Sequence, residues 1–144
     1  YEDVLKDIFK SDKIKSFPIE LVTLDSQIDQ IKTKVCLLKI DTEGHEKEVL
    51  LGSKNFLNKY KPESILLEFN EMNIFSHTTF NDIKKIIGNE YNSYRLLPGG
   101  NLLPLKNTSP LFTELYAYQN IVFLKENKNL KNTFSKLKSK NIIS

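Results

Sequence analysis

The sequence of 144 residues has little cysteine and no long apolar run. Cys36 is the only cysteine, which excludes an internal disulfide and fits a reducing compartment. No apolar stretch approaches the roughly 20 residues that a membrane-spanning helix needs. The opening sequence YEDVLKDIFK also lacks the pattern of a signal peptide. We therefore expect a cytoplasmic protein without a membrane span.

Arginine is almost absent as well, and the charges nearly balance. Lysine and arginine total 21 against 18 acids, a net charge of +3, and Arg95 is the sole arginine. This balance predicts no nucleic-acid partner. The lysine-rich segment 126–144 keeps Leu130, Phe134 and Leu137 at helical spacing, which is typical of a solvated helix face. A polyanion-binding tail is the alternative, although the aromatic interleaving of single-strand binders is missing.

A glycine-rich loop is the third absence. The sequence has 5 glycines, and none forms a G-x-G pattern after an early strand. It has no phosphate-binding loop, no Ser/His/Asp order and no Cys/His spacing of the kind that binds metals. We therefore assign no metal ligands.

The densest group of polar residues directly follows an apolar run. The segment Val35–Glu48, with the sequence VCLLKIDTEGHEKE, begins apolar and ends with acids around Gly44. An apolar run without alternation predicts a strand buried on both faces, here about Val35–Ile40. Ligands of open α/β sheets bind outside the carboxyl ends of the strands, where Asp41 and Glu43 would lie.

A second buried strand is expected at Ser64–Phe69, where it carries Glu68 near its end. A helix from about His45 to Lys59 would connect the two strands. Such a strand–helix–strand unit has a right-handed crossover and parallel strands. Asp41 and Glu68 would then lie near one another if the strands are neighbours.

The other patterns complete a three-layer α/β fold with a mostly parallel sheet and an antiparallel hairpin near its end. Gly52 lies on the apolar stripe of the connecting helix, which indicates close approach of the helix backbone to the sheet. The remaining expected elements are a helix at Tyr1–Lys10, a strand at Ile19–Leu24, helices at Gln27–Ile31 and Phe80–Ile87, hairpin arms at Tyr91–Leu97 and Leu102–Leu105, and a last strand at Asn120–Lys125.

Three segments, in this order, resemble the core of the FkbM-like S-adenosylmethionine-dependent methyltransferases. That family shows a Thr-Leu-Asp element, a Lys-Ile-Asp-x-Glu-Gly-x-Glu segment followed by Val-Leu-x-Gly, and a strand ending in Glu. The matching segments are Val22-Thr23-Leu24-Asp25, LLKIDTEGHEKEVLLGSKNFL and PESILLEFN. The resemblance covers about Ile19 to Phe69 well.

The resemblance implies an incomplete Rossmann-like class I methyltransferase domain. Residues 1–125 would form its carboxyl-terminal part, and residues 126–144 a lysine-rich tail. The last strand would lie antiparallel at or near the sheet edge. Cofactor-binding residues are expected mostly upstream of Tyr1, so we expect the fragment alone to be inactive. The implied activity transfers a methyl group from S-adenosylmethionine to an oxygen of a small molecule or sugar.

The candidate catalytic residues are Asp41, Glu43 and Glu68. Asp41 could orient the acceptor, act as a general base or hold a cation, and its alternative is a helix-start cap. Because Glu43 and Glu46 lie so close to it in sequence, at least one carboxyl should have a raised pKa or a cationic partner. Glu46 fits better as a first-turn acid that favours the helix dipole. The alternative for Glu68 is a solvated loop acid.

The candidate substrate-binding residues are Lys39, Gly44, His45 and Asn70. Lys39 could be the cationic partner of the acids or a lysine that only extends to solvent at a strand end. Gly44 would allow a tight turn and close approach of a ligand to the backbone. His45 titrates near neutral pH, but a lone histidine at a helix start is more often solvent-facing.

A non-enzymatic function competes with this interpretation. The chain could be an α/β interaction module, or a degenerate methyltransferase remnant that keeps the sheet and has lost the cofactor site.

Overall fold

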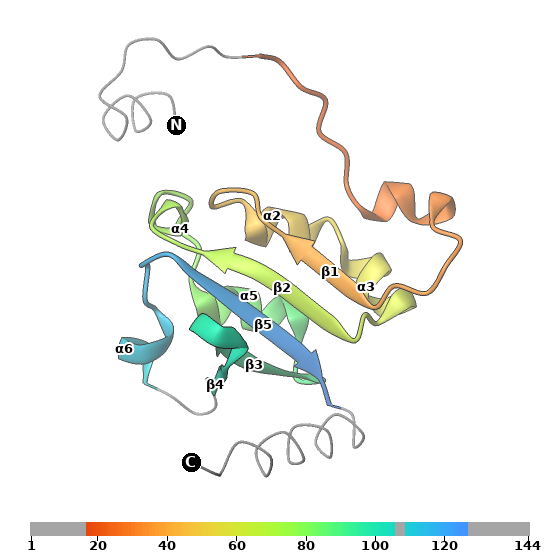
Figure 1. Ribbon diagram of the computed structural model, residues 1–144. Helices are drawn as coiled ribbons and strands as arrows, with labels where there is room; N and C mark the ends of the chain where they lie inside the picture. The colour runs from red at the N-terminus through yellow and green to blue at the C-terminus, as the bar shows by residue number, and fades with distance from the viewer. Residues whose placement is uncertain (1–16, 106–108, 127–144) are drawn as a thin grey trace.

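The computed structural model describes residues 17–105 and 109–126 (Figure 1). The expected helix Tyr1–Lys10 and all of the tail except Glu126 lie outside these residues. The elements, in chain order, are η1 (Asp25–Gln30), β1 (Leu37–Ile40), α2 (Glu46–Leu51), α3 (Lys54–Tyr60), β2 (Ser64–Phe69), α4 (Met72–Phe75), α5 (Phe80–Ile87), β3 (Tyr91–Leu96), η2 (Pro98–Gly100), β4 (Leu102–Pro104), α6 (Pro110–Thr113) and β5 (Gln119–Lys125).

The strands form one five-stranded sheet in the order β1-β2-β5-β3-β4. Only β1 and β2 pair in parallel, while β5 pairs antiparallel with both β2 and β3, and β4 antiparallel with β3. The expectation of a mostly parallel sheet is therefore wrong. The expectation of β5 near the sheet edge is also wrong, because β5 inserts between β2 and β3. Since β2 and β3 both run against β5, they still point in the same direction as β1.

β1 is a border strand in the described part of the chain. It pairs there with β2 alone, and Leu37 is 53% exposed. The expectation of a strand over Val35–Ile40 that is buried on both faces is thus wrong. The strand is shorter, Leu37–Ile40, and it lies at the border of the sheet. An apolar run reveals that a strand is hydrophobic, but it does not say how many neighbours the strand has.

The helices α2, α3 and α5 lie on the same face of the sheet (Figure 1). The core between them includes Leu50 and Ile83 from the helices and Ile65, Leu67 and Phe123 from the strands, all fully buried. On the opposite face Leu66, Val122 and Leu124 are only partly buried. The described residues therefore do not confirm a second helical layer. None of their helices is long and apolar enough to span a membrane.

The connection between β1 and β2 consists of two helices where one was expected. α2 ends at Gly52 and α3 begins after Ser53. A Cβ at Gly52 would lie 3.2 Å from the Thr23 side chain. The close approach that we expected at Gly52 therefore involves the segment before η1, and not the sheet.

That preceding segment is anchored through Asp25. The expectation of a strand at Ile19–Leu24 is wrong, because residues 19–23 have no regular secondary structure and do not join the described sheet. The Asp25 carboxylate accepts hydrogen bonds from the backbone N–H groups of Asn55 (3.0 Å) and Phe56 (2.8 Å). It thus caps the start of α3 from a distant part of the chain, as carboxylates do at helix N-termini.

The later elements agree closely with the sequence pattern. α5 spans Phe80–Ile87 as expected; it starts with a capping box between Thr79 and Asp82. The predicted hairpin is present as β3 and β4. Residues 110–113, which lie outside every expected helix and strand, form the short helix α6.

We predict that Asp25→Ala lowers the free energy of unfolding by about 1 kcal/mol, because two α3 N–H groups lose their acceptor. Urea denaturation measures this effect. Asp29→Ala in the same η1 helix should change stability by less than about 0.5 kcal/mol. Equal effects of the two substitutions would contradict the capping role.

Candidate active site

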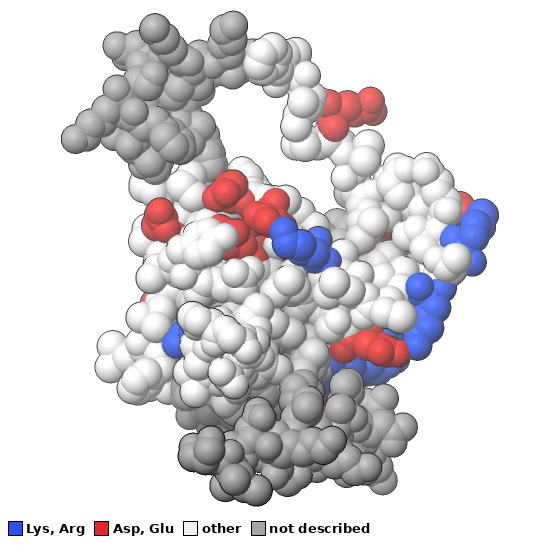
Figure 2. All heavy atoms as spheres, viewed as in Figure 1, with Lys and Arg blue, Asp and Glu red and all other residues white. Residues whose placement is uncertain are grey.

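Three carboxylates from two neighbouring strand ends meet at one rim of the sheet. Asp41 and Glu43 follow β1, and Glu68 lies near the end of β2. One oxygen of each lies within 4.8 Å of the others. Figure 2 shows acidic side chains gathered at this end of β1 and β2, beside a patch of basic atoms. The parallel pairing of Ile40 with Leu67 makes this meeting possible.

Lys39 supplies the positive charge at this rim. Its Nζ lies 2.5 Å from Oδ2 of Asp41. This hydrogen bond is the main reason that the pKa of Asp41 is lowered and that the pKa of Lys39 is raised. Lys39 is thus the cationic partner of an acid, and Asp41 remains ionised in neutral solution.

Glu68 has the opposite electrostatic environment. Its side chain is buried, with the residue 7% exposed. Burial is the largest cause of its raised pKa, and the charges of Asp41 and Glu43 raise it further, against a hydrogen bond from Asn70. The cationic partner expected for the acids after β1 is present as Lys39 beside Asp41. The raised pKa belongs to Glu68, which that expectation did not include.

Asn70 connects the two acids that Lys39 does not hold. Its Nδ2 donates to Oε1 of Glu68 (2.7 Å) and to Oε2 of Glu43 (3.1 Å). Its Oδ1 accepts from the backbone N–H of Met72 (2.8 Å). Asn70 is buried, so these bonds hold its amide in one orientation.

Gly44 brings the loop after β1 against the loop after β2. Its φ is +94°, and an added Cβ would lie 2.7 Å from the carbonyl oxygen of Met72. Glu43 beside it also has a positive φ of 51°. The tight turn expected at Gly44 is present, and the atoms that approach its backbone are those of Met72.

Glu46 points inward beneath this turn. It is 1% exposed, and its Oε1 accepts from the N–H of Thr42 (3.0 Å), the hydroxyl of Thr42 (3.1 Å) and the N–H of Gly44 (3.3 Å). Its Oε2 accepts from Nδ2 of Asn73 (2.8 Å). The sequence pattern placed Glu46 as a first-turn acid and did not reveal this buried network.

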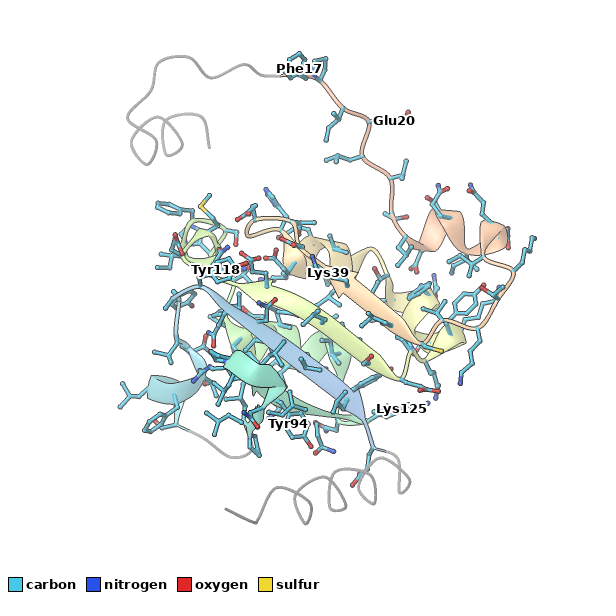
Figure 3. All side chains as sticks on the ribbon, in the orientation of Figure 1. Phe17, Glu20, Lys39, Tyr94, Tyr118 and Lys125 are labelled. Carbon is cyan, nitrogen blue, oxygen red and sulfur yellow. The ribbon has the colours of Figure 1, made fainter. Side chains whose placement is uncertain are left out.

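His45 and Tyr118 lie on the exposed side of the site. His45 is exposed, and its Nδ1 lies 3.8 Å from a carboxylate oxygen of Glu48. Tyr118 is 71% exposed, and the nearby charge of Glu68 is the main cause of the raised pKa of the tyrosine. Figure 3 shows Tyr118 and Lys39 at the same end of the sheet. Sequence reasoning missed Tyr118, although it directly precedes β5, which starts at this rim because it runs antiparallel to β2.

The three carboxylates could offer oxygen ligands to a hard cation such as Mg²⁺ or Ca²⁺. The described residues contain no other group of three acidic, histidine or cysteine side chains with this geometry. Lys39 balances the charge of Asp41 alone, whereas Glu43 and Glu68 accept hydrogen bonds from the uncharged amide of Asn70.

A comparison with models of protein families identifies the family to which the chain belongs. A family model described as "Methyltransferase FkbM domain" matches residues 3–96. The chain belongs to the FkbM methyltransferase family. Among curated proteins no match was found, and the same holds for solved structures.

The FkbM match covers both strand ends of the rim. Lys39, Asp41, Glu43 and Glu68 all lie inside the matched residues, whereas Tyr118 and β5 lie beyond them. The family thus indicates methyl transfer in general.

Replacing Gly44 should test the contact between the loops. We expect Gly44→Ala to destabilise the protein by about 2 kcal/mol or more, because the methyl group would meet the Met72 carbonyl and the φ is unfavourable for alanine. Gly88→Ala is the control, since Gly88 also has a positive φ (+86°) but nothing within 4 Å of an added Cβ. Thermal unfolding of both variants measures the difference. Equal losses of stability in the two variants would mean that the contact with Met72 adds no destabilisation to Gly44→Ala.

The raised pKa of Glu68 predicts a pH-dependent stability. A folded-state pKa above the unfolded value near 4.5 means that the neutral carboxyl is favoured by folding, so this contribution is lost as pH rises through the folded pKa. Glu68→Gln cannot ionise and should gain stability relative to the original protein between about pH 4 and pH 7. Glu63→Gln should show the opposite slope, because Lys34 lowers the pKa of Glu63. Urea denaturation at several pH values measures both slopes, and a flat or falling difference for Glu68→Gln would contradict the assignment.

Proposed function

We propose that this FkbM-family chain forms the acceptor side of an S-adenosylmethionine-dependent methyltransferase that methylates an oxygen of a small molecule or sugar. The single observation that supports this most strongly is the meeting of Asp41, Glu43 and Glu68 at one rim. Carboxylates and an amide in this arrangement can accept hydrogen bonds from several hydroxyl groups at once, which suits a carbohydrate. The cytoplasmic location predicted from the sequence is part of this proposal.

Glu68 is better suited than Asp41 to take up the acceptor proton. A general base works best when its pKa approaches the operating pH. The pKa of Glu68 is raised by burial, whereas that of Asp41 is lowered by Lys39. In this proposal Glu68 accepts the proton, Asp41 and Lys39 orient the acceptor, and Glu43 holds a neighbouring hydroxyl group. Asn70 keeps Glu43 and Glu68 in place through its two amide hydrogens.

The described residues do not fit the donor side of the reaction. Gly44 is packed against Met72 and Gly52 against Thr23, so neither leaves open backbone for a cofactor. Gly88, Gly99 and Gly100 lie in turns after α5 and between β3 and β4. S-adenosylmethionine would supply an activated methyl group, but we assign none of the described residues to its binding.

This misfit also supports the second candidate, a non-catalytic module of the same family. Calorimetry with S-adenosylmethionine on the full-length gene product separates the two. The enzyme proposal expects binding at millimolar cofactor or below. No heat of binding at millimolar cofactor would favour the non-catalytic module.

Two substitutions test the roles at the rim by activity. Glu68→Gln should lower kcat by about 10²–10⁴-fold through loss of the base. Asp41→Asn should abolish methyl transfer with little change in Tm, because an exposed ion pair contributes little to stability.

Glu63→Gln is the matched control for Asp41→Asn. It removes a Lys34–Glu63 pair with the same 2.5 Å distance at the opposite ends of the same strands, and should leave activity unchanged. A large loss of Tm in Asp41→Asn with activity retained would instead assign Asp41 to helix capping.

A further inference from the structure

Beneath the carboxylates of the rim lies a second layer of buried polar groups. Glu46 and Asn73 are 1% and 0% exposed, and they bond to each other. Glu46 holds the loop after β1 through Thr42 and Gly44. Asn73 holds the loop after β2, because its Oδ1 accepts from the N–H of Asn70 (2.9 Å).

The two hydrogen bonds of Asn73 fix the orientation of its side-chain amide. Its Nδ2 donates to Glu46 and its Oδ1 accepts from Asn70, so the amide cannot flip without losing both bonds. Asn70 in turn donates to Glu43 and Glu68. A continuous path of hydrogen bonds therefore runs from the first loop, through Glu46 and Asn73, to the side chains of the site.

We propose that Glu46 and Asn73 are positioning residues, which hold the loops after β1 and β2 in register so that the rim carboxylates face one acceptor atom. This inference rests on the proposed function of the rim, but it concerns residues to which that function gives no role. Neither side chain is exposed enough to contact an acceptor, so both act through Asn70 and the backbone of residues 42–44.

The hydrogen-bond pattern predicts which substitutions fail and which pair is rescued. In Glu46→Gln the new amide NH₂ faces the NH₂ of Asn73, and a flip of Asn73 only moves the clash to the N–H of Asn70. In Asn73→Asp two carboxylates face each other. In the double variant the new amide at position 46 would donate to the new carboxylate at position 73. That carboxylate would still accept from Asn70, so every donor again meets an acceptor.

Hydrogen exchange and kinetics on the full-length product test this together. We expect each single variant to speed amide exchange at Asn70 by about tenfold or more, and the double variant to restore the original rate. We expect kcat to fall by about 10- to 100-fold in each single variant and to recover in the double, with the KM for S-adenosylmethionine changed less than about twofold. Glu48→Gln, an exposed acid of the same helix, is the control and should change neither quantity.

The outcomes separate the two proposals. Original exchange rates at Thr42, Gly44 and Asn70 in both single variants would overturn the positioning pair, whatever the activity. Faster exchange with unchanged kcat would reduce the pair to a purely structural role while the proposed function stands. An original protein that transfers no methyl group would overturn the proposed function and any catalytic role of the pair, and exchange would still decide whether the pair holds the loops.

Discussion

The parallel pairing of β1 with β2 is the constraint on which the candidate site depends. It places Ile40 opposite Leu67, so that the chain leaves both strands at the same rim. The helices between them return the chain to the start of β2 and bury Leu50 against Ile65 and Leu67 in one core cluster. Without this pairing, Asp41 and Glu68 would have no reason to meet.

Each acid at or beneath the rim has a different electrostatic environment. Asp41 is exposed and pairs with Lys39, while Glu68 is buried and has a raised pKa. Glu46, the most deeply buried acid described, is surrounded by hydrogen-bond donors from the backbone and Asn73. Like charges in contact are costly unless a cationic partner, hydrogen-bond donors or a raised pKa offsets the repulsion, and each of these is present here.

Features that depend on a short stretch of sequence were predicted well. The extent of α5, the hairpin around Gly99 and the convergence of Asp41 with Glu68 follow from helical spacing, turn residues and strand direction. The sheet order was not predictable in this way. The apolar run Ile121–Leu124 predicts a strand, but it does not say that β5 inserts between β2 and β3.

The residues at the two strand ends could be predicted, whereas the groups beneath and beside them could not. Lys39, Asp41 and Glu43 alternate along one short segment of the sequence, whereas Asn73 in α4 and Tyr118 before β5 reach the rim through a chain path that no local pattern fixes. The inward orientation of Glu46 likewise depends on Thr42 and Gly44 turning their donors toward it. Long-range hydrogen bonds of this kind become visible only once the strands are paired.

The central claim is that two strand ends deliver interacting carboxylates to one rim, and a carbon-13 NMR titration of the Asp41 and Glu68 carboxyl groups tests it most directly. The account predicts a pKa for Glu68 above, and for Asp41 below, the ordinary values of 4.5 and 3.8. It also predicts that the pKa of Glu68 falls in Asp41→Asn, because the charge of Asp41 helps to raise it. Ordinary values for both groups, with Glu68 unaffected by Asp41→Asn, would contradict the account.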